Sequence, residues 1–557
     1  MNKGALVLIG IVIVVVIGIA VFSLTKVQKN QPEGKPEPQP AVTESKSVTQ
    51  KGVSTSDVFY SDLPVIAPKK IVLVVDATTY QMLKSEIDRF ANDISVDLKN
   101  SVKILDKNYG SPSEVKTSLT QEKNNNGDFA GIIFIGDIPW QYLSTKGVLQ
   151  SPAASDSWYL DLEDKNLYTE KINTECKDPN LMDQEGKCIA SYLEVTMGAG
   201  FEKSISRWSG RIMPTLGKSD RMELLKSYFD RNHDYRQGNL KYEGALIYGP
   251  DPTLNACKQS NECFSEAKKH FVDETHITTE DKLNVIAAVS PEENTEATYL
   301  SKQKEPYKFE LVNAHGGTTS FMSGREKTDT ITYSELVDNK PGALFTIFQS
   351  CSVGSFNVKD NLATAHIFEG NGLAAYAASL PIFTLSPFEP NFNDLSFFIV
   401  GAGGRLHEAF STRHYFNILG DPTIRINEPP KEGCKLAFNQ TKVDLDIRLT
   451  QNGVENNDEL GKHVKIKNIG SDTCYIRFNE VVSKGQGPAA SFSFDKPKNK
   501  IDPGEIVEFK ISSGLQSYTS DLWGADKTIR FSGLITFVTN DPQYLKSIPV
   551  QVTLIKV

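Results

Sequence analysis

The chain has 557 residues, a formal net charge of −9, 39% hydrophobic residues and 23% charged residues. A chain of this length does not fold around one hydrophobic core, so several domains are expected, and its composition is that of a globular protein. The negative charge, and the lack of a basic run with interleaved aromatic residues, argue against a nucleic acid as partner.

The N-terminus predicts a membrane anchor followed by a tether. Gly4–Leu24 contains no charged residue and is rich in Val and Ile. At about 1.5 Å per residue, a helix of this length crosses a bilayer, and its end lacks the Ala-x-Ala-like site at which signal peptides are cleaved. We therefore favour a retained transmembrane signal-anchor over residues 1–25 to a cleaved signal peptide. Residues 26–65 are polar and Pro-rich around Pro32–Pro40, which predicts a disordered tether.

Residues 66–430 alternate between apolar strands and amphipathic helices. We expect strands at Ile71–Asp76, Val102–Asp106, Phe129–Asp137, Ser206–Ile212, Tyr242–Asp251, Phe309–Ala314, Ala343–Cys351 and Gly372–Ser379. Helices are expected at Tyr80–Leu98, Ser113–Lys123 and Ser219–Arg236. This alternation is typical of an α/β domain with a mainly parallel sheet and helices on both faces.

Residues 431–557 show a different hydrophobic period. Apolar and polar residues alternate with period two in four segments, Lys442–Leu449, Val464–Ile469, Ile506–Ile511 and Phe531–Val538. Turn residues separate these segments at short spacing. The pattern predicts an all-β, antiparallel sandwich of immunoglobulin-like type.

The seven cysteines indicate an oxidising compartment. Six of them form three local pairs that leave Cys351 over: Cys176 with Cys188, Cys257 with Cys263, and Cys434 with Cys474. Disulfides persist outside the cytosol, so we expect the bulk of the chain to be extracellular. The alternative is a set of reduced cysteines in a reducing compartment. Zinc is disfavoured because no pair has Cys-x-x-Cys spacing.

Two strand ends carry residues for thiol chemistry. One predicted strand leads into His315-Gly316-Gly317, and another ends at Cys351. In α/β sheets, chemistry collects at the carboxyl ends of the strands, where a histidine can manage the proton of a cysteine nucleophile. Either residue alone is more often structural. Together, with glycines that leave room for a peptide and for oxyanion donors, they predict a cysteine peptidase.

Several motifs resemble those of the gingipain family, in the caspase-like clan of cysteine peptidases. They are His315-Gly316, the small residue before Cys351, Ile132–Pro139, Ser155-Asp156-Ser-Trp-Tyr159, Gly210-Arg211-Ile212 and Leu419-Gly-Asp421-Pro422. The resemblance covers about residues 66 to 557, and the motifs occur in the family's order. It implies a caspase/gingipain-like catalytic domain over residues 66–430, followed by the β-sandwich.

The resemblance also implies roles for individual residues. Cys351 would attack the scissile carbonyl, and His315 would protonate the leaving amine. Backbone N–H groups of Gly316 and Cys351 would bind the oxyanion. Asp251 stands where the family has a longer glutamate that orients the histidine.

The substrate pocket and a structural ion are less defined. The candidate pocket residues are Asp156, Glu262, Ser379 and Phe383, and the stretch around Phe383 is more apolar than in the family's basic-residue cleavers. Asp161, Glu163 and Asp164 suit either a solvated acidic loop or a structural calcium site. The chemistry itself requires no cofactor.

The sequence therefore predicts a single-pass, membrane-anchored extracellular cysteine endopeptidase acting on peptides or proteins. One alternative is a catalytically inactive, peptidase-like surface adhesion or scaffold protein. The other is a transpeptidase of the same clan, which would pass the acyl group to an amine instead of water.

Overall fold

The computed structural model describes residues 70–145, 152–162, 168–173, 188–195, 207–249, 268–269, 271–273, 275–287, 296–323, 329–379, 395–410, 416–428, 433–450, 453–454, 461–484, 492–494, 500–513, 528–540 and 545–556. The predicted anchor and tether lie outside these residues. Within them, none of the helices has the length and apolar character needed to span a membrane.

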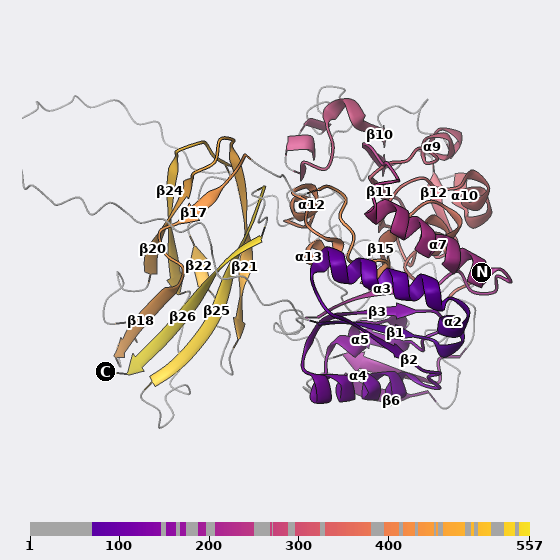
Figure 1. Cartoon of the computed structure of the whole chain (residues 1–557), viewed down its shortest axis with the longest axis horizontal. Coiled ribbons are helices and arrows are strands. Elements are labelled where there is room, and N and C mark those ends of the chain that lie inside the picture. Colours follow the sequence, from indigo (N-terminus) through magenta and orange to yellow (C-terminus); the bar gives the residue numbers. More distant parts are fainter. Residues whose placement is uncertain are drawn as a thin grey trace, which may run out of the picture. The chain divides into compact units, whose positions relative to one another are not determined.

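A ten-stranded sheet forms the centre of the α/β domain (Figure 1). Its strand order is β10 (Leu283–Ala287), β9 (Ala245–Gly249), β11 (Phe309–Asn313), β14 (Phe345–Gln349), β15 (Ala374–Ala378), β16 (Phe416–Gly420), β8 (Trp208–Ile212), β3 (Phe129–Ile135), β1 (Lys70–Val75) and β2 (Val102–Asp106). The first five strands are parallel to one another and form the first block. The last five are also parallel and form the second block.

The two blocks meet in one antiparallel pair, between β15 and β16. The expected parallel arrangement is therefore present within each block, but the whole sheet is mixed. Because the strand direction reverses at β15 and β16, the carboxyl ends of the two blocks lie at opposite edges of the sheet. Only the first block therefore has the carboxyl ends of its strands at the edge where His315 and Cys351 lie.

Helices cover both faces of the second block. Alternate side chains of β1 enter two separate cores, because successive residues of a strand point to opposite faces. Ile71, Leu73 and Val75 pack with α3 (Lys84–Leu98) and α7 (Arg221–Arg236). Val72 and Val74 pack with α4 (Pro112–Asn126). Figure 1 shows α3 and α4 on opposite sides of these strands.

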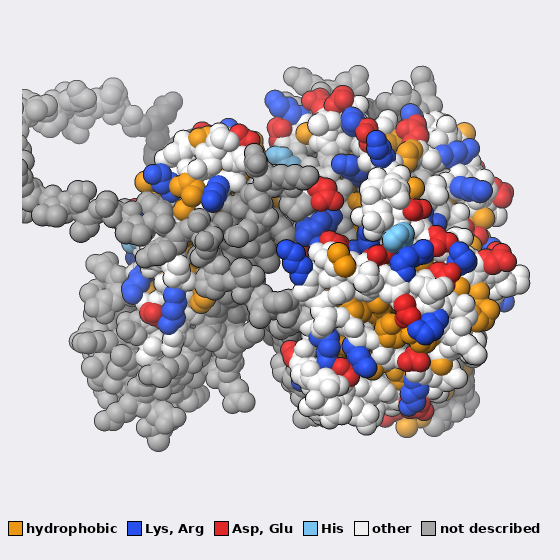
Figure 2. Space-filling view, in the orientation of Figure 1, with side chains coloured by type: hydrophobic (Ala, Val, Ile, Leu, Met, Phe, Trp, Pro, Cys, Tyr) orange, Lys and Arg blue, Asp and Glu red, His pale blue; other side chains and the backbone are white. Residues whose placement is uncertain are grey.

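The helix expected at Tyr80–Leu98 is divided in two. A short helix, α2 (Ala77–Met82), is capped by the Asp76 side chain, which accepts the N–H of Thr79, and it ends at Leu83 before α3 begins. The exposed sides of α3 and α7 carry charges of both signs, including an ion pair between Arg89 and Asp230. Figure 2 shows Lys and Arg interspersed with Asp and Glu on this face.

The remaining helices of the domain are short. They are α5 (Ser157–Leu160), η3 (Glu280–Lys282), α9 (Glu296–Lys302), α10 (Tyr333–Asn339), α11 (Leu362–Thr364), α12 (Leu395–Gly401) and α13 (Leu406–Ala409), with a π-helical turn, η4 (Ala365–Glu369), directly after α11. Two small sheets complete the domain. One has the order β5 (Ala153–Ser155), β4 (Gln141–Thr145), β7 (Ser191–Val195) and β6 (Tyr168–Ile172), and the other pairs β12 (Ser320–Ser323) with β13 (Asp329–Thr332).

The C-terminal strands form two sheets over a shared core. One has the order β17 (Leu436–Phe438), β20 (Gly461–Asn468), β24 (Ile506–Ser513) and β22 (Phe492–Phe494). The other has the order β19 (Gly453–Val454), β18 (Val443–Thr450), β26 (Leu545–Lys556), β25 (Thr528–Thr539), β21 (Cys474–Lys484) and β23 (Lys500–Ile501). The expected purely antiparallel pairing is wrong at one place, because β18 pairs with β26 in parallel.

Candidate active site

The register of two parallel strands brings His315 and Cys351 to equivalent positions. In the pairing of β11 with β14, Asn313 is opposite Gln349, the last residue of each strand. His315 and Cys351 each follow two residues later. Neighbouring strands are about 4.8 Å apart, so both residues leave the sheet side by side at one edge. His315 is exposed, and Cys351 is partly exposed and carries a thiol that is not part of a disulfide.

The backbone after His315 turns back at once into β12. The N–H of Met322 donates to the His315 carbonyl at 2.7 Å, and the N–H of Gly317 donates to the Ser320 carbonyl at 2.8 Å. These two bonds flank the facing pair of Gly316 and Phe321. In such a pair the N–H groups point outward, so the N–H of Gly316 is directed away from β12. That orientation suits an oxyanion donor.

Gly316 also packs against the residue before the cysteine. A Cβ at this position would lie 2.5 Å from Ser350 Oγ and 2.8 Å from the Phe321 Cβ, which is closer than real contacts allow. Only glycine lets the His315 and Cys351 loops approach this closely. A Cβ added to the next residue, Gly317, would have no non-neighbouring atom within 4 Å.

The residue after Cys351 is held in a strained conformation. Ser352 has a φ of 58°, in the left-handed region that non-glycine residues adopt at a cost of about 1–2 kcal/mol. Its carbonyl accepts the N–H of Ser355 at 3.0 Å, which closes a tight turn beyond the thiol. Backbone strain of this kind persists where surrounding contacts fix it, and it is frequent at functional sites.

Ser379 belongs to the wall of this turn. Its hydroxyl donates to the Gly354 carbonyl at 2.9 Å and accepts from Asn417 Nδ2 at 2.6 Å. In return, Ser355 Oγ donates to the Ser379 carbonyl at 2.8 Å. Ser379 is buried, at 2% exposure. These contacts make it a support of the Cys351 loop, and its direct contact with substrate stays a prediction.

Several buried hydroxyls near the dyad have no hydrogen-bond partner within the described part of the chain. They are Ser350 Oγ, which faces Gly316, and Thr318 Oγ1 and Ser323 Oγ, which lie on the loop and strand that follow His315. Most buried polar atoms are satisfied in folded proteins. The three oxygen atoms are themselves buried, so they belong to the interior and not to an exposed binding surface.

Asp156, predicted to line the substrate pocket, forms a buried ion pair instead. Arg211 Nε and Nη2 donate to the two Asp156 carboxylate oxygens at 3.0 Å and 2.6 Å, and the two side chains are 0% and 2% exposed. The guanidinium also lies over the rings of Phe134 and Phe356. Both carboxylate oxygens are thus engaged in the interior, which supports a structural role. A role of Asp156 in binding substrate stays a prediction.

Three other predicted site residues, Asp251, Glu262 and Phe383, lie outside the described residues. The strand that leads to Asp251 is described: β9 pairs with β11 on the side away from β14, with Tyr248 opposite Val312. The strand order is therefore β9, β11, β14, which has the histidine strand in the middle.

The calcium hypothesis is untested. Asp161 is buried at 4% exposure, while Glu163 and Asp164 lie outside the described residues. Across the ranges that the structure describes, no three His, Cys, Asp or Glu side chains gather in a way that could hold a metal ion.

One of the three predicted disulfides is confirmed. Cys434, just before β17, is bonded to Cys474, the first residue of β21, with a Cα–Cα distance of 4.9 Å. Cys188 is also disulfide-bonded, while Cys176, Cys257 and Cys263 lie outside the described residues.

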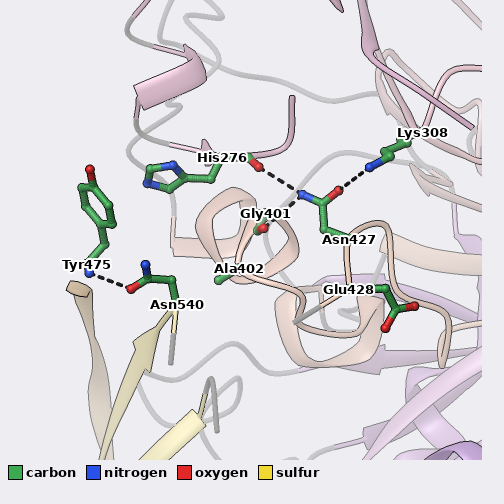
Figure 3. Close-up of a pocket in the computed structure, with 8 residues that line it drawn as sticks. All are labelled: His276, Lys308, Gly401, Ala402, Asn427, Glu428, Tyr475 and Asn540. Carbon is green, nitrogen blue, oxygen red and sulfur yellow. Dashed lines mark hydrogen bonds between the residues drawn. The ribbon is translucent and has the colours of Figure 1, made fainter. Parts of the chain in front are cut away.

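A cavity of about 510 Å³ lies elsewhere in the molecule (Figure 3). Its lining residues are His276, Lys308, Gly401, Ala402, Asn427, Glu428, Tyr475 and Asn540. Asn427 Nδ2 donates to the carbonyls of His276 and Gly401, and its Oδ1 accepts from Lys308 at 3.0 Å. Burial lowers the pKa of His276 and of Lys308. None of the predicted site residues is among these eight, so the cavity is not the candidate active site.

No protein-family model and no curated protein matches the chain. Among solved structures, gingipain R, an Arg-specific cysteine proteinase, is similar over 89% of this chain and 100% of its own, with a TM-score of 0.44 and 10% identity. The periplasmic chaperones YadV and SfaE are each similar over 22% of this chain and over 51% and 57% of their own, with TM-scores of 0.15 and 0.16 and identities of 12% and 10%. Values at this level define neither a family nor an activity.

Proposed function

We propose that this protein is a cysteine endopeptidase that hydrolyses peptide bonds with Cys351 and His315. The observation that carries the proposal is the register of β11 and β14, which ends both strands at one level and leads each into one of the two residues. A cysteine nucleophile needs a base or ion-pair partner within hydrogen-bond reach. Two side chains that leave adjacent parallel strands at the same offset are placed to come into that reach.

The reaction follows from these positions. The Cys351 thiolate attacks the scissile carbonyl carbon, and the carbonyl oxygen takes the negative charge. The N–H groups of Gly316 and Cys351 stabilise that oxygen. His315 then donates its proton to the leaving nitrogen as the C–N bond breaks, which leaves an acyl-enzyme. In the second step His315 removes a proton from water, and the hydroxide attacks the acyl carbon, so that the C–S bond breaks, the acid product leaves and the Cys351 thiolate with protonated His315 is restored.

Several observations support parts of this proposal. The outward N–H of Gly316 suits an oxyanion donor. We propose Asp251 as the group that orients His315, because its strand neighbours the histidine strand. The disulfides at Cys188 and between Cys434 and Cys474 support an extracellular location of the catalytic part.

The test is hydrolysis of a fluorogenic peptide library by the full-length protein and by Cys351→Ala and His315→Ala. We expect at least a thousand-fold loss in both variants, on the order of what removing a catalytic nucleophile or base costs, with unchanged thermal unfolding. His463→Ala is the matched control, because that histidine is exposed on the β-sandwich, and it should retain full turnover. Turnover that survives Cys351→Ala would contradict the proposal.

A further inference from the structure

We propose that Asn361 is a positioning residue that holds the turn beyond Cys351 in the shape the thiol requires. This inference rests on the proposed function of the same site. Asn361 is ten residues beyond Cys351 and is 0% exposed. The hydrogen bonds of its side chain go to residues other than Cys351 and His315. Its role would therefore be exerted through the backbone.

The side chain of Asn361 uses its donors on the turn after the cysteine. Nδ2 donates to the Val353 carbonyl at 2.7 Å and to the Ser355 carbonyl at 3.2 Å. The carbonyl groups at these two positions lie on either side of Gly354, within the turn that Ser352 starts. One amide thus fixes the direction of two peptide groups immediately beyond the thiol.

The other end of the Asn361 amide group caps the helix that follows. Asn361 Oδ1 accepts the N–H of Thr364 at 3.0 Å, so the residue is the N-cap of α11. The amide is therefore held at both ends, by a helix terminus and by the turn. A side chain with both ends engaged transmits the position of the helix to the turn.

Asn361 also connects the cysteine loop to the histidine loop. The next residue, Leu362, donates its N–H to the Thr318 carbonyl at 3.0 Å, and Thr318 follows His315 by three residues. The turn beyond Cys351 is thus bonded to Asn361, and the loop beyond His315 is bonded to its neighbour Leu362. A shift of Asn361 would change the relative position of the thiol and the imidazole.

The conformation of Ser352 shows why such a brace is needed. A left-handed serine directly after the nucleophile is unfavourable by itself and persists only where its surroundings fix it. The Nδ2 donations to Val353 and Ser355 act on the residues just beyond it. Without them, the turn can relax to an ordinary backbone conformation, and the thiol moves with it.

The chain contains a matched control in the β-sandwich. Asn468 is also 0% exposed, and its Nδ2 donates to the carbonyls of Asp472 at 2.8 Å and Ile501 at 2.9 Å. Its Oδ1 accepts the N–H of Gly470 at 2.9 Å. The two asparagines therefore have the same number and kind of hydrogen bonds and the same burial, but Asn468 belongs to a separate core.

The experiment compares Asn361→Ser with Asn468→Ser in the full-length protein. Serine keeps an N-cap acceptor, removes both Nδ2 donations and adds no buried charge. Asn361→Asp and Asn468→Asp form a second pair, which keeps the side-chain shape and removes the same donors. Each variant is measured for thermal unfolding, for kcat and KM on the cleaved peptide, and for the rate of Cys351 alkylation by iodoacetamide between pH 5 and 9.

We expect Asn361→Ser to lower kcat by about 10- to 100-fold with KM changed by less than about threefold, because misplaced reacting groups affect the chemical step. Its alkylation rate should change in size or pH profile, which a purely structural role would not cause. Asn468→Ser should lose similar thermal stability but keep kcat and alkylation. If the two variants have the same kcat and the same alkylation profile, Asn361 is not a positioning residue.

The outcomes separate this inference from the proposed function. If the wild-type protein cleaves no peptide, the proposed function fails, and the alkylation comparison alone decides whether Asn361 positions the thiol. If the wild type is active and Asn361→Ser matches Asn468→Ser in every measurement, only the inference is overturned.

Discussion

The two blocks of the central sheet bury different polar groups: the second pairs arginines with aspartates, and the first combines a contact between Glu310 and His366 with unpartnered hydroxyls. In the second block, charged side chains are paired in the interior: Arg211 with Asp156, and Arg236 with Asp421. In the first block, Ser350, Thr318 and Ser323 have buried hydroxyls without a partner in the described part of the chain. Each block is parallel within itself and packs over an apolar core, so these two features do not distinguish the blocks.

Asp421 shows the fullest saturation in the second block, although Asn417 Oδ1 of the same block has no partner among the described residues. Asp421 is 0% exposed. Its carboxylate accepts from Thr423, at both N and Oγ1, and from Asn232 Nδ2 at 2.8 Å. Burial raises the pKa of this carboxyl, but Arg236 and these hydrogen bonds outweigh burial and hold the pKa below its usual value. A fully engaged carboxylate stabilises the fold and has no capacity left for a ligand. The Gly-Asp-Pro motif is thus structural in this molecule.

The comparison also shows where strain is tolerated. The first block carries a left-handed Ser352 beside the thiol, and the buried hydroxyls lie around the same loops. Functional sites are where local rules of backbone and polar satisfaction are broken. The second block has exceptions of its own, a left-handed Lys99 at the end of α3 and an Asn417 Oδ1 without a partner among the described residues, so such features alone do not mark a site.

The largest expected effect comes from breaking the buried pair in the second block. Arg211→Met leaves the Asp156 carboxylate buried without its cation, so we expect the free energy of unfolding to fall by about 3–5 kcal/mol. The measurement is urea unfolding of the full-length protein followed by tryptophan fluorescence.

The double variant Arg211→Met with Asp156→Leu is the control for this prediction. It removes both charges, and it should recover most of the lost stability, since apolar replacements of a buried pair are often neutral. A loss of under 1 kcal/mol in the single variant would mean that the pair is solvated.

The two strands that lead to His315 and Cys351 were predicted from the sequence, because they are continuous apolar runs. Phe309–Ala314 and Ala343–Cys351 predicted β11 and β14 within two residues. The rule that parallel strands end at one edge then placed His315 beside Cys351. Local apolar pattern and a general property of sheets were sufficient to predict that the two residues follow the same end of adjacent strands, and their catalytic pairing stays a prediction.

Features that depend on distant partners were not accessible. The residues of Phe416–Gly420 give no indication that this strand pairs antiparallel with β15. This one pairing reverses the strand direction of the second block. Asp156 and Arg211 are 55 positions apart, so their ion pair depends on the folded sheet. Asn361 carried no signal either, because its partners, Val353 and Ser355, are backbone carbonyls whose directions are set by the turn.

A smaller effect is expected from adding one methyl group at the dyad. Gly316→Ala places a Cβ 2.5 Å from Ser350 Oγ and 3.0 Å from the Ser320 carbonyl oxygen, so the two loops must separate. Displacement of this kind costs about 100-fold in turnover, and we expect kcat/KM to fall by that order while the unfolding temperature changes little.

Gly317→Ala is the matched control for this variant. It adds the same methyl group where nothing lies within 4 Å, so kcat/KM should stay within about threefold of wild type. Equal activity of the two variants would show that the approach of the His315 and Cys351 loops is not required for turnover. The close packing of these two loops would then have no bearing on function.

The smallest effect concerns pH and again belongs to the second block. His407 on α13 stacks on Trp208 of β8 at 4.3 Å, and its Nδ1 lies 2.9 Å from the Pro422 carbonyl. Burial lowers the pKa of His407 below its usual 6.5, while Glu408 and Asp421 oppose that shift and Arg405 adds to it. The unfolded chain therefore binds a proton more readily than the folded protein. Stability from this group is complete above about pH 6.5 and is lost as pH falls through the folded pKa.

His407→Gln should accordingly flatten the decline in unfolding free energy between pH 7 and pH 5, measured by urea unfolding at several pH values. His463→Gln is the control, since that histidine is exposed on the β-sandwich, and it should leave the decline nearly unchanged. Burial lowers a histidine pKa because it removes water that would solvate the charged imidazolium. An unchanged slope in His407→Gln would therefore mean that α13 is hydrated where it meets β8, and that the second block is less tightly closed than its paired charges indicate.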